Sequence, residues 1–132
     1  MKVAVWDTYV KKENGNVLHF DIIVPQNITD ESLIFDYGKE YLTSIQTNGK
    51  ITSEECQYCH IESPSNEIIT AIEQKGYYIL EMEEISKELS QTPTRKEMIL
   101  FLKAHFKDYR FANFKGVSEE EVREKLKSKM NE

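Results

Sequence analysis

The chain has 132 residues, and its 23 Asp and Glu outnumber its 17 Lys and Arg, which gives a formal net charge of −6. This length fits one domain with room for an appendage, and 39% hydrophobic with 30% charged residues excludes the disordered and fibrous classes. Two cysteines are too few for a disulfide scaffold, and no run reaches the roughly 18 apolar residues of a membrane-spanning helix. Asp7 interrupts the apolar amino terminus, so we expect no secretory signal and a cytoplasmic protein.

The charge is distributed unevenly along the chain. Residues 1–92 hold 7 Lys and 16 acidic residues, a net charge of −9, whereas residues 93–132 hold 10 Lys and Arg and 7 acidic residues, a net charge of +3. A proline, Pro93, lies where the two parts meet. We therefore predict a domain over residues 1–90 and an extension over residues 91–132.

Two segments rich in β-branched and aromatic residues, 3–10 and 17–24, predict a β-hairpin, because Asn14-Gly15 lies between them. A two-residue loop at Asn14-Gly15 pairs Glu13 with Asn16. This register decides which side chains share each face of the hairpin.

The following segments predict two helices and two further strands. Apolar residues at helical spacing predict helices over residues 30–45 and 65–75, the second ending at Gly76. Residues 51–62 fit either a helical turn or a strand, and residues 77–82 fit a strand. The order β-β-α-β-α-β indicates an α+β fold in which two helices cover a mixed four-stranded sheet.

The extension predicts two amphipathic helices, which Thr94 and Ser118 cap. Neither helix could bury its apolar stripe alone, so we expect the extension to pack on the body or on a second subunit in a homodimer. Basic and aromatic residues alternate here, a pattern that is also typical of nucleic-acid binding. We favour packing, because the net charge is only +3 and three consecutive glutamates interrupt the basic residues.

The sharpest motif is C-x-x-C-H at residues 56–60. This pattern is typical of haem c attachment, but attachment requires export and a haem-sized pocket, for which the sequence gives no support. If the segment is a turn, Cys56, Cys59 and His60 share one side and His19 completes a zinc site; in a strand Cys59 points away and chelation fails. The alternatives are thiol redox chemistry, which the surrounding glutamates disfavour, and cysteines that pack as small hydrophobic residues.

A second cluster combines His19 and Asp21, which strand alternation places on one sheet face, with Thr8 opposite Asp21. A histidine near a carboxylate can act as a general base or support a metal ligand, although the wetter face of an antiparallel sheet commonly carries such residues. The same register puts Asp7 on the core face, where an unpaired carboxylate is costly. The phosphate-loop, nucleophile-elbow and His-Glu-x-x-His motifs are absent, so nucleotide-binding and hydrolase classes lack support.

Four motifs in the same order, at residues 6–10, 19–21, 53–60 and 76–83, resemble the DUF2024 family of small bacterial proteins. The resemblance covers roughly residues 1–85 and implies a small bacterial α+β domain but no reaction, because the family name denotes unknown function. Residues from about 90 onward have no counterpart in the family pattern. The resemblance implies that the polar residues of the site are shared within the family, namely Asp7, Thr8, Tyr9, His19, Asp21, Cys56, Cys59 and His60.

Three functional hypotheses follow, while the substrate and partners stay unknown. The favoured one is a binding module that uses Asp7, Thr8, Tyr9, His19 and Asp21, with zinc as the candidate cofactor at Cys56, Cys59, His60 and His19. The second, which we rank lower, is a thiol or acid/base enzyme. The third is an interaction protein that dimerises through its C-terminal helices.

Overall fold

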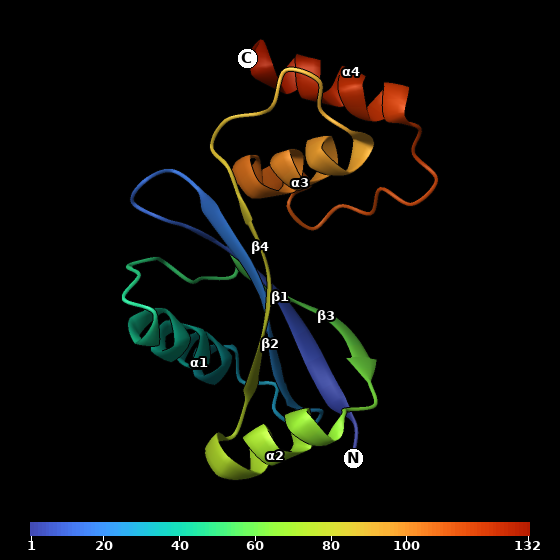
Figure 1. Cartoon of the computed structure of the whole chain (residues 1–132). Helices are drawn as coiled ribbons and strands as arrows, with labels where there is room; N and C mark the ends of the chain where they lie inside the picture. The colour runs from blue at the N-terminus through green and yellow to red at the C-terminus, as the bar shows by residue number, and fades with distance from the viewer.

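A four-stranded sheet forms the centre of the protein, with the strand order β3-β1-β2-β4 (Figure 1). The computed structural model describes residues 1–132. None of its helices combines the length and the apolar character that crossing a membrane requires. The α+β class and the predicted order of strands and helices are confirmed. In chain order the elements are β1 (Val3–Lys11), β2 (Val17–Pro25), α1 (Glu31–Ser44), β3 (Cys56–Glu62), α2 (Asn66–Lys75), β4 (Tyr78–Ile85), α3 (Arg95–His105), the 3-10 turn η1 (Lys107–Tyr109) and α4 (Glu119–Met130).

The prediction of a mixed sheet is wrong, because all three pairs of neighbouring strands are antiparallel. Strands β2 and β3 do run in the same direction, and α1 connects them. However, β1 lies between them, so this parallel pair shares no hydrogen bonds. The sheet is therefore antiparallel although the chain contains a crossover helix.

The hairpin register also differs from the prediction by one residue. Asp7 faces Asp21, and Lys12 N–H donates to Asn16 O, so the loop has three residues rather than two. Gly15 is in the left-handed region, with φ 91°, and its N–H donates to Lys12 O. A type I turn followed by such a glycine is the usual three-residue hairpin loop. The one-residue change moves every side chain of β2 to the opposite face relative to β1.

Helix α1 covers one face of the sheet and buries the largest apolar core. Gly38 allows this contact, because a Cβ atom there would lie 2.6 Å from Ile51 Cδ1 and 2.9 Å from Ile22 Cδ1. The helix therefore approaches the sheet more closely than an alanine would permit, which offsets the low helix propensity of glycine. The buried members of this core are Ala4, Trp6, Val10, Phe20, Ile22, Val24, Ile34, Leu42, Ile51, Cys56 and Tyr77.

The opposite face is covered at its two ends and not in the middle (Figure 1). Helix α2 packs on Val3, Val5 and Ile23 at one end. Helix α3 packs at the other end, where Ala104 meets a cluster that includes Tyr9. Polar residues of β1 and β2 lie between these two apolar clusters.

The extension has a core of its own and is joined to the sheet of the same chain. Met98, Phe101, Leu102, Phe114, Val122 and Leu126 form this second core. Arg110, only 8% exposed, ties it to the body, because its guanidinium donates to the carbonyl oxygens of Lys103, Ala104 and Glu54. An ion pair of 2.6 Å between Lys107 and Glu54 adds a surface contact.

We expect Arg110→Met to lower the free energy of unfolding by about 2–3 kcal/mol, because it leaves buried carbonyl oxygens without donors. The matched control is Arg123→Met, which removes an exposed pair between neighbouring turns of α4 and should cost no more than about 0.5 kcal/mol. Urea unfolding of both variants measures the difference. Equal losses would show that Arg110 does not join the extension to the body.

Candidate functional site

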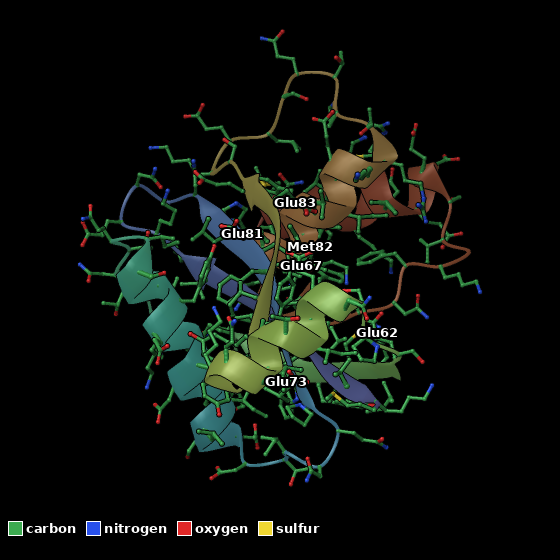
Figure 2. The ribbon with its side chains drawn as sticks, turned by 60° about the horizontal axis from the view of Figure 1, so that its bottom comes forward. Glu62, Glu67, Glu73, Glu81, Met82 and Glu83 are labelled. Carbon is green, nitrogen blue, oxygen red and sulfur yellow. The ribbon has the colours of Figure 1, made fainter.

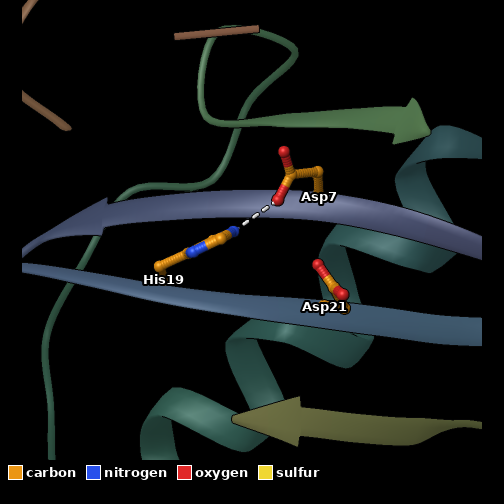
Figure 3. Close-up of side chains that lie close together, drawn as sticks. All are labelled: Asp7, His19 and Asp21. Atoms are coloured by element: carbon orange, nitrogen blue, oxygen red, sulfur yellow. Dashed lines mark hydrogen bonds and ion pairs between the residues drawn. The ribbon is translucent and has the colours of Figure 1, made fainter. Parts of the chain in front are cut away.

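Asp7, His19 and Asp21 converge on one face of the sheet (Figure 3). Helices α2 and α3 cover the two ends of this face. The pairing of Asp7 with Asp21, and of Tyr9 with His19, turns these side chains toward the same face. One ligand atom from each of the three residues lies within 4.8 Å of the other two. Other groups of His, Cys, Asp and Glu in the structure do not reach this spacing.

The imidazole of His19 lies between two carboxylates. Its Nε2 is 2.6 Å from Asp7 Oδ1, and because an ionised carboxylate only accepts, Nε2–H is the donor (Figure 3). Its Nδ1 has no hydrogen-bond partner and is 3.6 Å from Glu83 Oε2. The side chain of His19 is only 10% exposed, so water reaches the ring from few directions.

Tyr9 holds the ring of His19 in place from one side. The two rings stack with centroids 4.2 Å apart and an interplanar angle of 5°. The ring of Phe111, in the extension, contacts the ring of Tyr9 edge-on, with 6.1 Å between the centroids. Burial, followed by the negative charge of Asp7, raises the pKa of Tyr9 far above its usual range. Tyr9 therefore stays protonated at neutral pH.

The site carries an excess of negative charge. Burial, followed by the charge of Asp7, raises the pKa of Asp21 to about 6, although His19 and His60 partly oppose this shift. Burial disfavours the imidazolium of His19, but the hydrogen bond and the charge of Asp7, helped by Glu83, outweigh it and raise the pKa of His19. The imidazole of His19 therefore lies among three carboxyl groups, those of Asp7, Asp21 and Glu83. Such a site favours the arrival of a cation.

Glu83, which comes from the edge strand β4, was not predicted as a residue of the site (Figure 2). The β2–β4 pairing shifts register between Leu18 and Phe20, opposite His19. A bulge of this kind redirects a side chain, and nothing in the period-two pattern of β4 marks it. The signal that could have pointed to this strand is its acidic run at residues 81–84, which is unusual for a strand beside a hydrophobic hairpin.

Two predictions about the hairpin faces are wrong for the same reason. Asp7 does not face the main core, and Thr8 does not lie opposite Asp21, because Thr8 pairs with Phe20. The side chain of Thr8 is fully buried on the face that α1 covers, where its hydroxyl donates to Trp6 O. Thr8 is therefore outside the Asp7–His19–Asp21 cluster.

The C-x-x-C-H segment forms strand β3 with a bulge, and its two cysteines have different environments. Cys56 is buried in the α1 core, opposite Thr8, and burial raises its thiol pKa to about 12. Cys59 is an exposed free thiol, whose sulfur lies 3.2 Å from His60 Nδ1. The structure does not bring Cys56, Cys59, His60 and His19 together as ligands, because Cys56 lies on the other face of the sheet from His19.

The amino-terminal part of the chain matches a known domain family. Residues 1–82 match a domain family described as a domain of unknown function, DUF2024. The chain belongs to the DUF2024 family. It is also similar to protein NE1680 from Nitrosomonas europaea, a structural genomics target solved by NMR, with 42% sequence identity and a TM-score of 0.57. That match covers 63% of this chain and 96% of NE1680. A comparison with curated proteins finds no match.

The DUF2024 match contains Asp7, His19, Asp21 and Tyr9, whereas the residues that pack on Tyr9 from the extension lie outside it. Phe111 and Ala104 of the extension bury Tyr9. Lys103 of α3 is half-buried; burial lowers its pKa, and the charge of Asp7 partly offsets this. The extension therefore shapes the surroundings of a cluster that the DUF2024 domain supplies.

We expect Asp21→Asn to stabilise the metal-free protein at neutral pH. A raised pKa means that protonation of Asp21 favours the folded state at low pH, and that this contribution is lost as the pH rises through about 6. The asparagine removes this loss, so the melting temperature should rise by about 2–5 °C at pH 8. The gain should shrink toward pH 4, and thermal unfolding in the presence of a chelator measures both values.

The control for this comparison is Asp36→Asn, which changes an exposed carboxylate on α1 that only a 3.9 Å pair to Lys39 engages. It should leave the melting temperature nearly unchanged at both pH values. A destabilising effect of Asp21→Asn at pH 8 would contradict the assignment of Asp21 as a repelled carboxylate.

Proposed function

We propose that this DUF2024 protein binds a divalent metal ion through Asp7, His19 and Asp21. The convergence of three ligand atoms within 4.8 Å, on two adjacent strands, is the observation that supports this function. Imidazole nitrogen and carboxylate oxygen are ligands of Zn²⁺, and also of Mn²⁺ and Fe²⁺. Three protein ligands leave a coordination position for water or for a bound molecule, as in catalytic rather than structural zinc sites.

The charge of the site favours the same function. Asp7 and Asp21 face each other across neighbouring strands, where like charges directly opposite one another are destabilising. A divalent cation between them would remove this repulsion. Glu83 of β4 adds a further negative charge beside His19 (Figure 2).

The contact between His19 and Asp7 gives the proposal a pH dependence. Two ligand atoms that each lie about 2.0–2.1 Å from a tetrahedral zinc are about 3.3 Å from one another. The observed separation of Nε2 and Oδ1 is 2.6 Å, which is that of a short hydrogen bond with one proton between the two atoms. A zinc ion held by both His19 and Asp7 would take the place of this proton, and the two side chains would have to lie slightly farther apart.

The other hypotheses have less support. Burial, and then the charges of Asp7 and Asp21, raise the pKa of the Cys59 thiol, which disfavours the thiolate that a thiol enzyme needs. Among the four ligands proposed from the C-x-x-C-H motif, only His19 belongs to the cluster. The apolar stripes of α3 and α4 are buried against each other within one chain, which leaves less apolar surface for dimerisation.

We expect untagged protein to bind Zn²⁺ at pH 7.5 and to be stabilised by it. At a free zinc concentration of about 100 times Kd, the stabilisation is about 2.7 kcal/mol, which thermal unfolding detects as a shift of several degrees. His19→Gln and Asp7→Asn should each abolish the shift. Isothermal titration calorimetry should show proton release on binding, and an affinity that falls as the pH is lowered from 8 to 5.5.

Cys59→Ser provides the matched control, because it removes a good zinc ligand outside the cluster. This variant should bind zinc as the original protein does. Loss of binding in Cys59→Ser with retention in His19→Gln would move the site to the C-x-x-C-H segment. Failure of the original protein to bind either Zn²⁺ or Mn²⁺ would refute the proposed function.

A further inference from the structure

A second candidate site lies where the DUF2024 domain meets the extension. A cavity of about 260 Å³ opens between the end of β4, the following connection at residues 86–90, and helix α3. This volume is slightly below the range of about 300–1,000 Å³ that is typical of pockets for drug-sized ligands, so it suits a smaller molecule. The cavity is separate from the Asp7–His19–Asp21 cluster, although Glu83 borders both.

Four of the ten residues that line the cavity are apolar. Ile85 and Leu89 line it from the domain side and the connection, and Leu100 and Phe101 line it from α3. Ile85 and Phe101 are buried, and Leu89 and Leu100 are partly buried. These side chains offer no ligand atom to a metal ion, but they suit an aliphatic chain.

The polar part of the wall is acidic, and no Lys, Arg or His lines the cavity. Two of its four glutamates are already engaged. Glu84 pairs with Lys12 and accepts a hydrogen bond from Asn16, and Glu97 accepts from Ser90 and the Thr94 cap.

The two remaining glutamates are available to a ligand. Glu88 has no ion pair or side-chain hydrogen bond, and the neighbour of Glu83 is His19 Nδ1 at 3.6 Å, which is too long for a hydrogen bond. His19 Nδ1 is itself buried without a hydrogen-bond partner. Both residues line the cavity, so a cationic donor bound there would lie beside two carboxylates that make no hydrogen bond to another side chain.

We propose that this cavity binds a small organic cation: a primary ammonium group on an unbranched aliphatic chain. The chain packs on Leu89, Leu100 and Phe101, and the ammonium group donates to Glu83 and Glu88. An anion would meet four glutamates and no cation, and a neutral alcohol would leave the carboxylates without a counter-charge. The ammonium group can belong to a free alkylamine or to a lysine side chain of a peptide, because both present the same chemistry.

The test is an NMR titration of the full chain, labelled with nitrogen-15, at pH 7.0 in the presence of a chelator. The probe is n-pentylamine, with n-pentanol as the neutral control and hexanoate as the anionic control. We expect n-pentylamine to bind with Kd of about 1 mM, to perturb the amides of Ile85, Ser86, Leu89 and Leu100, and to bind at least tenfold more tightly than either control. Equal or tighter binding of n-pentanol or hexanoate would overturn the proposal.

Substitutions in the wall test which groups hold the ammonium. Glu88→Gln should weaken n-pentylamine binding about fivefold, and the double variant Glu83→Gln with Glu88→Gln should weaken it further. Glu120→Gln, at an exposed acid of α4 outside this cavity, should leave binding unchanged. Unchanged binding in the double variant, or equal loss in Glu120→Gln, would overturn the proposal.

A third probe, Nα-acetyl-lysine methylamide, distinguishes the two sources of the ammonium group. Tighter binding than n-pentylamine supports a peptide lysine as the occupant, and weaker binding supports a free amine. Because the chelator keeps the metal cluster empty, and because Glu88 lies outside that cluster, this experiment can fail while the zinc experiment succeeds.

Discussion

The left-handed conformation of Gly15 sets the register of the β1–β2 hairpin, and the rest of the structure depends on that register. With a three-residue loop, Asp7 faces Asp21, and Tyr9 faces His19. With a two-residue loop, the same side chains would separate onto opposite faces, since a shift by one residue inverts the alternation of a strand. The main core and the polar cluster are therefore fixed together by one backbone conformation: Trp6, Phe20 and Ile22 lie on the face that excludes the acids.

In this arrangement the Asp7–His19–Asp21 cluster lowers the stability of the domain. Two facing carboxylates and a nearly buried imidazole cost free energy, which is visible in the raised pKa of Asp21. Apolar clusters at both ends of the same face, one under α2 and one under α3, offset this cost. Residues that destabilise the fold where they lie, yet are held by well-packed neighbours, are typical of sites that serve function rather than folding. Tyr9 takes part in both the apolar cluster under α3 and the polar cluster, because it is buried by the extension and stacks on His19.

The elements could be predicted from the sequence, whereas only some residues of the site could be predicted, namely Asp7, His19 and Asp21. Side chains that accept from backbone N–H groups mark the starts of all four α-helices, at Asp30, Ser65, Thr94 and Ser118, and these signals are local. His19 and Asp21 were recognisable as a pair because strand alternation is local as well. The partnership of His19 with Asp7 needed the loop conformation, and the position of Glu83 needed a bulge in another strand. The spacing of Cys56 and Cys59 suggested a metal site, but the segment forms a strand in which Cys56 is part of the apolar core.

The opposite net charges of the acidic body and the basic extension favour contact between these two parts of the chain. Its basic residues meet the acidic body at a few points, among them Lys107 with Glu54 and Arg110 with the peptide oxygen of Glu54. These contacts orient α3 over the end of the sheet, where Leu100 and Phe101 close the wall of the cavity beside Glu83. The metal cluster lies within the residues that match DUF2024, whereas the cavity needs α3, which lies beyond them. The two sites can therefore differ in their distribution among DUF2024 proteins: the first depends on the shared hairpin, and the second depends on an extension like this one.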